Sequence, residues 1–296
     1  MPWGYIRLNS GYAIPSIAFG TWTLGNGQDP IDQVAQSLEN GFDHIDTAQS
    51  YRNEAEVAVL SRTDVFITTK YSGTDGLDMD TSIRNSVANS MSTCILIHAP
   101  RLAVPDIPTA WARMEKIREA GFARSIGVSN FDEKDLEILL GSAKIKPAVN
   151  QILLHPYVYR RQRPILEYAA KHGIVIEAYS ALIPITQLPG GPLDAPLNTI
   201  ASRLGATTDQ VLLAWTKAKG AVVVTTSSKK SRLHGYLTAG DIALTQEDID
   251  MIDAAGAIGE QRSMNTKMTV RKLVNHGLVA LALLVVGSYY IDMRIF

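Results

Sequence analysis

The sequence lacks the cysteines and the charge imbalance that would assign it to several common classes of protein. Its single cysteine, Cys94, rules out an internal disulfide and indicates a reducing compartment. Cys94 lies in an apolar stretch, so we expect a buried and unreactive thiol. The 28 basic and 29 acidic side chains give a formal net charge of −1, and no basic field favours nucleic acid as a partner.

Several motifs are also missing. No Gly-x-Gly-x-x-Gly follows an apolar stretch, which argues against a doubly wound dinucleotide-binding fold. The histidines and acidic residues do not recur at the spacing of metal ligands, so no metal is expected. The first five residues lack the basic start and apolar run of a signal peptide.

What the sequence does contain is a repeated alternation of short apolar stretches with amphipathic helical ones. At 296 residues and 46% hydrophobic, the chain can bury the core of one α/β barrel. We predict a (β/α)8 TIM barrel over residues 1–260, with an N-terminal β-hairpin, Tyr5–Asn9 and Tyr12–Pro15, plugging one end. The predicted barrel strands are Ile17–Trp22, 41–46, Val65–Lys70, Cys94–His98, Ala123–Asn130, Pro147–Gln151, Ile174–Ser180 and Ala221–Thr225. Among the predicted helices, the first has Asp29 as its N-cap, a later one runs from Arg160 to His172, and another runs from Thr208 to Lys219 with Thr208 as its cap.

Three of these strands end in ionisable side chains. Asp46, Lys70 and His98 each close a strand, and Tyr51 follows the first of them. The carboxyl ends of parallel barrel strands open onto one face, so the four side chains should converge there. A buried Asp46 needs a cation, which Lys70 supplies. Lys70 is in turn expected to lower the pKa of Tyr51 by favouring the phenolate.

The motifs at the strand ends resemble those of the aldo-keto reductase family, in the same order, over roughly residues 5 to 256. The matching blocks are 41–51 with Asn53 and Glu54, Ile67–Lys70, Leu96–Pro100, Ser125–Phe131 and Val149–Gln151. The stretch from Val222 to Gly240 looks closest to fungal members that act on α-keto amides, α-keto esters or small aldehydes.

The resemblance implies an NADPH-dependent reduction of aldehydes or ketones. Tyr51 would give a proton to the carbonyl oxygen, and His98 would polarise that oxygen. Asp46 and Lys70 complete the implied catalytic group. Trp22, with His98, would line the substrate site.

The resemblance also implies the cofactor site. Ser129, Asn130 and Gln151 would bond the nicotinamide carboxamide, while Tyr179 offers a ring to stack on it. Ser227 and Arg232 match the family's adenosine-phosphate contacts at the start of a helix. The full predicted set is Thr21, Ser129, Asn130, Gln151, Tyr179, Ser180, Leu182, Ser227, Ser228, Lys229 and Arg232.

The sequence departs from the family at a few places. Thr226 stands where most relatives carry lysine, so Arg232 with Lys229 would have to hold the extra phosphate of NADPH. Residues 52–64 leave a crossover near the minimum length, and the passage through residues 92–94 is short. These contractions favour an alternative, a cofactor-binding but non-catalytic redox sensor or membrane-associated subunit. Leu182 to Pro196 is predicted to be a long loop over the open face.

The C-terminal end differs from the rest of the chain. Gly277 to Ile291 carries no charge, and a basic linker over 261–272 precedes it. Its 15 residues reach about 22 Å as a helix, against a hydrocarbon core of about 30 Å. A helix packed on the barrel is the other interpretation, but the run is apolar on all sides. We predict a transmembrane tail anchor over 273–296 that leaves a cytosolic catalytic domain. The oligomeric state is left open.

Overall fold

The computed structural model describes residues 3–58, 65–90 and 93–263. Eight parallel strands close into a barrel in the order β10-β3-β4-β5-β6-β7-β8-β9. Each strand therefore pairs with its neighbour in sequence, and β10 closes the ring against β3. The strands are β3 Ile17–Gly20, β4 His44–Asp46, β5 Phe66–Tyr71, β6 Cys94–Ile97, β7 Ser125–Ser129, β8 Val149–Leu153, β9 Val175–Tyr179 and β10 Val222–Thr225.

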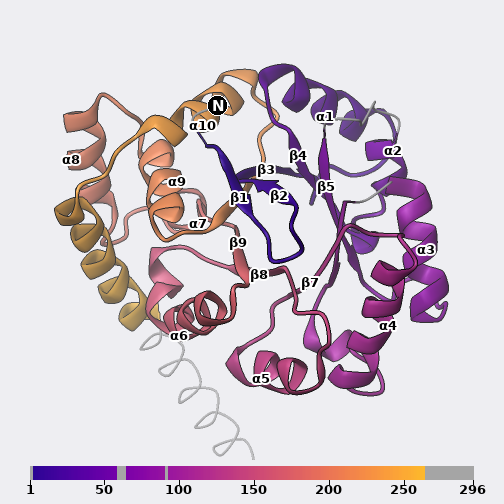
Figure 1. Cartoon of the computed structure of the whole chain (residues 1–296). Coiled ribbons are helices and arrows are strands. Elements are labelled where there is room, and N and C mark those ends of the chain that lie inside the picture. Colours follow the sequence, from indigo (N-terminus) through magenta and orange to yellow (C-terminus); the bar gives the residue numbers. More distant parts are fainter. Residues whose placement is uncertain (1–2, 59–64, 91–92, 264–296) are drawn as a thin grey trace, which may run out of the picture.

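Helices form a ring around these strands (Figure 1). They are α1 Gln28–Asn40, α2 Glu54–Ala58, α3 Met79–Ser90, α4 Ile107–Glu119, α5 Glu133–Ser142, α6 Pro156–His172, α7 Ile183–Thr186, α8 Asp194–Leu204, α9 Thr208–Ala218, α10 Lys230–Thr238 and a last helix over 246–263. Short 3-10 turns are η1 Gln49–Tyr51, η2 Pro100–Leu102 and η3 Ala239–Asp241. The largest apolar cluster lies between strands and helices, with Trp111, Phe131 and Trp215 fully buried in it. The (β/α)8 barrel predicted from the sequence is confirmed.

The N-terminal hairpin closes one end of the barrel. Strands β1, Tyr5–Arg7, and β2, Ala13–Pro15, pair antiparallel and lie across the middle of the ring in Figure 1. Leu8 and Ile14 pack against the first residues of several barrel strands, among them Phe66 and Cys94. These first residues mark the amino end of the barrel, so the opposite end is left for a site.

Several element boundaries differ from the predicted ones. Helix α6 begins at Pro156 rather than Arg160, because a proline is compatible with the first turn, where its missing N–H would be unpaired anyway. Helix α1 starts one residue before Asp29, which was the predicted N-cap, and Gly27 takes that position. Thr207, not Thr208, caps α9, in a capping box with Gln210.

The predicted loop over Leu182 to Pro196 is wrong in part. Helix α7 occupies Ile183–Thr186, and α8 begins at Asp194. Pro184 falls in the first turn of α7, where a proline favours rather than breaks a helix. The connection is therefore anchored by a short helix at the end where it leaves β9.

Some predictions lie outside the described residues. These are the tail anchor over 273–296, the linker beyond residue 263, residues 59–64 of the short crossover and residues 91–92. Within the part that is described, none of the helices has the length and apolar character needed to cross a membrane.

Candidate active site

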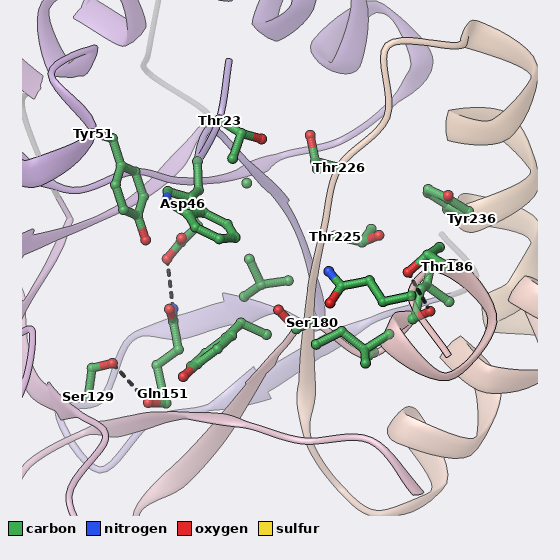
Figure 2. Close-up of a pocket in the computed structure, with 18 of the residues that line it drawn as sticks. Thr23, Asp46, Tyr51, Ser129, Gln151, Ser180, Thr186, Thr225, Thr226 and Tyr236 are labelled. Atoms are coloured by element: carbon green, nitrogen blue, oxygen red, sulfur yellow. Dashed lines mark hydrogen bonds between the residues drawn. The ribbon is translucent and has the colours of Figure 1, made fainter. Parts of the chain in front are cut away.

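A cavity of about 750 Å³ opens at the carboxyl ends of the barrel strands. Figure 2 shows side chains from opposite sides of the barrel pointing into it. Its lining combines strand ends with the segments that follow β3, β4, β6, β7, β9 and β10. The lining residues include Gly20, Trp22, Thr23, Asp46, Ser50, Tyr51, His98, Ser129, Asn130, Gln151, Tyr179, Ser180, Leu182, Thr225, Thr226, Arg232 and Tyr236.

At the centre of the site lies a buried ion pair. Lys70 Nζ is 2.7 Å and 2.8 Å from the two carboxylate oxygens of Asp46, and neither side chain is more than 3% exposed. The ammonium also donates to the carbonyl oxygen of Thr47 at 3.0 Å and to the Tyr51 hydroxyl at 3.3 Å. Burial lowers the pKa of Lys70, but the attraction and hydrogen bond of Asp46, together with Tyr51 and Glu177, outweigh burial and the net shift is upward. Lys70 is therefore a fixed cation beneath Tyr51.

Lys70 acts on the pKa of Tyr51 in the predicted direction, but it does not decide the net shift. Burial raises the pKa of Tyr51 above 10.0, and the nearby Lys70 only partly offsets that shift. The reason is that burial in the cavity wall destabilises the phenolate by removing water more than the attraction of one ammonium group stabilises it. Tyr51 therefore keeps its proton at neutral pH, with a cation positioned to receive the negative charge when the proton leaves.

His98 completes the group next to Tyr51. The two rings meet edge to face with centroids 5.8 Å apart. Burial, followed by the charge on Lys70, lowers the pKa of His98 to about 4. Its Nδ1 lies 2.7 Å from the Ser72 hydroxyl and 3.5 Å from that of Ser50. If Ser72 donates to Nδ1, the single proton of the neutral ring is on Nε2, where the ring can donate.

The predicted carboxamide-binding residues lie together beyond Asp46. The Ser129 hydroxyl donates to the backbone carbonyl of Gln151 at 2.9 Å. Asn130 donates to the His98 carbonyl oxygen at 3.1 Å and accepts from the Tyr179 hydroxyl at 2.9 Å. Asn130 and Ser180 both have left-handed backbones, with φ of 61° and 60°. Such backbones are uncommon outside glycine and often occur at functional sites.

The predicted phosphate-binding residues divide into two groups. Arg232, on α10, lines the cavity, and among the described residues no ion pair engages its guanidinium. Ser227, Ser228 and Lys229 precede that helix and are not part of the cavity lining. A cation without a carboxylate partner at the first turn of a helix suits an anionic group.

Of the remaining predicted residues, Trp22 lines the cavity and Thr21 does not. Trp22 lines the cavity with 62% of its surface exposed, as a substrate wall would require. Thr21 is fully buried, and its hydroxyl is 3.0 Å from both Thr47 and Asn53, so its side chain supports the strand ends instead of lining the cavity. Among the described residues, no group of histidine, cysteine and acidic side chains is placed to hold a metal ion.

The sequence reasoning missed two polar residues of the site. Ser72 bonds His98 from two positions after Lys70, and nothing in its local sequence distinguishes it from a surface serine. Glu177 lies fully buried in β9, and burial together with the Asp46 charge raises its pKa to about 8. A carboxylate inside the apolar run 174–179 was the signal that could have revealed it.

A closed parallel barrel with its ionisable side chains gathered at the carboxyl end of the strands defines a barrel enzyme. Comparison with known proteins narrows that class. The model of the aldo/keto reductase family matches residues 16–184 and 191–257. The chain belongs to the aldo/keto reductase family and is an NAD(P)H-dependent oxidoreductase.

Similar curated proteins are themselves reductases. The NAD/NADP-dependent indole-3-acetaldehyde reductase of Schizosaccharomyces pombe is 34% identical, over 80% of this chain and 87% of that protein. The NADPH-dependent alpha-keto amide reductase of Saccharomyces cerevisiae is 31% identical, over 85% of this chain and 90% of that protein.

Solved structures agree with the fold. An aldo/keto reductase from Brucella melitensis has a TM-score of 0.75 at 30% identity, covering 86% of this chain and 98% of its own. The Bombyx mori aldo-keto reductase in complex with NADP has a TM-score of 0.76 at 26% identity, covering 85% of this chain and 92% of its own.

Proposed function

We propose that this protein reduces an aldehyde or ketone to the alcohol with NADPH, and that Tyr51 is the proton donor. The observation that carries the proposal is the placement of the Tyr51 hydroxyl 3.3 Å from the buried Lys70 ammonium, at the wall of the cavity. His98 stands beside it as a neutral ring. The alpha-keto amide and indole-3-acetaldehyde reductases among the relatives favour α-keto amides, α-keto esters and small aldehydes as substrates.

The residues of the cavity suit the cofactor. Ser129, Asn130 and Gln151 supply amide and hydroxyl groups for a carboxamide, and Tyr179 supplies a ring face in the same wall. Arg232, on α10, supplies a cation in the cavity lining for a phosphate. When bound, NADPH would supply the hydride that adds to the carbonyl carbon of the substrate.

The chain's own contribution is to the oxygen of that carbonyl. As the C=O double bond becomes a single bond, its electron pair moves to oxygen, and Tyr51 transfers its phenolic proton there. The resulting phenolate lies next to the Lys70 ammonium, whose own charge is balanced by Asp46. A proton on His98 Nε2 would give the developing alkoxide a second donor. The products are the alcohol and the oxidised cofactor, and solvent returns the proton to Tyr51.

The test is replacement of Tyr51 by Phe, which removes the hydroxyl and keeps the ring. We expect kcat for carbonyl reduction to fall by about 10²- to 10⁴-fold while the affinity for NADPH is unchanged. The measurement is NADPH oxidation against a panel of aldehydes and α-keto carbonyls, together with NADPH binding. Tyr168→Phe, a tyrosine packed on His172 of α6, is the matched control and should behave as the wild type.

A specific observation favours a second function. The short crossover after Tyr51 predicts that the catalytic side chains are held away from the geometry that turnover needs. Such a protein would bind the cofactor without reducing a carbonyl, as a redox sensor does. The predicted tail anchor would make such a sensor membrane-tethered. Tight NADPH binding by the folded wild type, with no turnover of any carbonyl in the panel, would overturn the reductase and support the sensor.

A further inference from the structure

Glu177 is a buried carboxyl group with one hydrogen-bond partner in the site. It lies on β9 directly opposite Gln151 of β8 in the barrel register. Gln151 is part of the cavity lining and Glu177 is not, so Glu177 supports the cavity wall from inside the barrel. Its Oε2 accepts from Gln151 Nε2 at 2.5 Å, while Oε1 has no partner among the described residues. Whatever Glu177 does for the site therefore acts through Gln151.

The amide of Gln151 is held from two sides. The same Nε2 donates to Asp46 Oδ2 at 2.7 Å, the contact drawn between Gln151 and Asp46 in Figure 2. An amide NH2 carries two hydrogens, and these two carboxyl groups take both. Asp46 is the carboxylate of the Lys70 ion pair, so its oxygens can only accept. Rotating the amide by 180° would turn its oxygen toward the Asp46 carboxylate, which is repulsive.

We propose that Glu177 is a positioning residue that, together with Asp46, fixes the Gln151 amide so that only its oxygen remains free, as an acceptor for the NH2 of the nicotinamide carboxamide. The inference rests on the proposed function, because it assumes that the nicotinamide ring binds beside Gln151. It adds a residue beneath the cavity wall and a direction for the hydrogen bond. Asp46 thereby serves both Lys70 and the cofactor site.

The direction of this hydrogen bond gives a selectivity that can be measured. In the 3-acetylpyridine analogue of NADP⁺ a methyl group replaces the carboxamide NH2 and the carbonyl is retained. That analogue would leave the fixed Gln151 oxygen without a donor. An unsatisfied buried acceptor weakens binding by roughly tenfold. A freely rotating amide would instead turn its NH2 toward the analogue's carbonyl and discriminate less.

The experiment compares the dissociation constants of NADP⁺ and its 3-acetylpyridine analogue by quenching of tryptophan fluorescence, which Trp22 in the cavity wall makes sensitive to binding. Wild type should prefer NADP⁺ by about tenfold. Glu177→Met, similar in length but without an acceptor, releases one Nε2 hydrogen of Gln151 while the other stays on Asp46. The amide can then tilt and offer that hydrogen to the carbonyl of the analogue, so the preference should fall to about twofold or less. Glu177→Gln, which keeps an acceptor opposite Gln151, should restore it. Glu177→Thr, too short to reach the amide, replaces the methionine variant if that one does not fold.

Equal preference in the wild type and Glu177→Met would overturn the positioning role. A wild type that binds both cofactors equally would overturn the fixed amide itself. Failure of the proposed reductase is distinguishable from both, because it would appear as normal NADP⁺ binding and normal discrimination in a protein without turnover. A wild type that binds neither cofactor would overturn the inference along with the cofactor site.

Discussion

In the proposed mechanism, the Ser72 hydroxyl sets the position of the proton on His98 by donating to Nδ1. Ser72 Oγ lies 2.7 Å from Nδ1, whereas Ser50 Oγ is 3.5 Å from the same atom. Removing the closer hydroxyl by Ser72→Ala should let the neutral ring protonate Nδ1 and lose its donor at Nε2. We expect kcat to fall about tenfold with an unchanged KM for NADPH. Ser50→Ala is the matched control and should change kcat by less than twofold. Steady-state kinetics decide, and equal losses in both variants would contradict this assignment of the tautomer.

Glu177 also gives the free energy of unfolding a dependence on pH. Burial, followed by the Asp46 charge, raises its pKa from 4.5 to about 8. Between these values the folded protein holds a proton that the unfolded chain has released, so the wild type loses stability as the pH rises. Glu177→Gln has no such proton. Urea unfolding should show the two proteins alike near pH 5 and the variant more stable at pH 8, by on the order of 2 kcal/mol. A difference that does not change with pH would show that Glu177 titrates normally.

At the residue scale, site residues that end a strand can be predicted from the sequence. The buried polar residues that hydrogen-bond to them cannot. Asp46, Lys70 and His98 were identified because each ends an apolar run, and parallel strands bring such ends together. Ser72 and Glu177 were not, because their partners are distant in sequence: Ser72 bonds His98, and Glu177 bonds Gln151. Local sequence carries no record of which buried polar group will face another.

At the scale of elements, the carboxyl group of Glu54 ties the described part of the short crossover after Tyr51 to its neighbours, alongside Glu56, which accepts from the backbone N–H of Gly27 at 2.9 Å. The described part of helix α2 spans five residues, and a helix turn of that length contributes little stability by itself. Glu54 at its start accepts from Thr69 of β5 at 2.5 Å and from Ser86 of α3 at 3.1 Å. The carboxyl group therefore links α2 to the strand that carries Lys70 and to the next helix.

Glu54→Ala should accordingly destabilise the fold and disturb the site. It deprives the buried Thr69 hydroxyl of its acceptor, which typically costs about 1–3 kcal/mol of the free energy of unfolding. We expect a lower thermal midpoint together with a reduced kcat, since Thr69 precedes Lys70. Glu54→Gln keeps an acceptor for Thr69 and is the control. A variant as stable as the wild type would show that other contacts hold the crossover.

Element types were predicted more reliably than element ends. The eight barrel strands and the hairpin follow from apolar runs separated by helical ones, a signal spread over many residues. Ends depend on single contacts. Pro156 starts α6 and Thr207 caps α9, each a position or more from where the sequence placed the boundary. Helix α7 has four residues, which is too few for a hydrophobic repeat of 3.6 residues to be visible in the sequence. The segment was therefore predicted to be a loop.

At the scale of the whole molecule, the closed barrel buries the ionisable groups of the site together, and their shifted pKa values should set how activity depends on pH. Burial and Lys70 lower the pKa of His98 to about 4, and burial raises the pKa of Tyr51 above 10.0. Reduction needs the protonated phenol and, in the proposed mechanism, the neutral imidazole. Both forms are present between these limits, so kcat/KM for carbonyl reduction should be level from about pH 5 to about pH 9.

The same profile in two variants separates the contributions of the two groups. Replacing Lys70 by Met would remove the cation that partly offsets burial, and its main effect should be a large fall in kcat without a new step near neutrality. His98→Gln should remove the fall below about pH 5 and leave the alkaline limb unchanged. A wild-type profile that instead falls on the acid side near pH 6.5, the ordinary value for an imidazole, would show that His98 is solvated in the working enzyme. The barrel wall around the site would then be more open to water than its buried ion pair and neutral ring indicate.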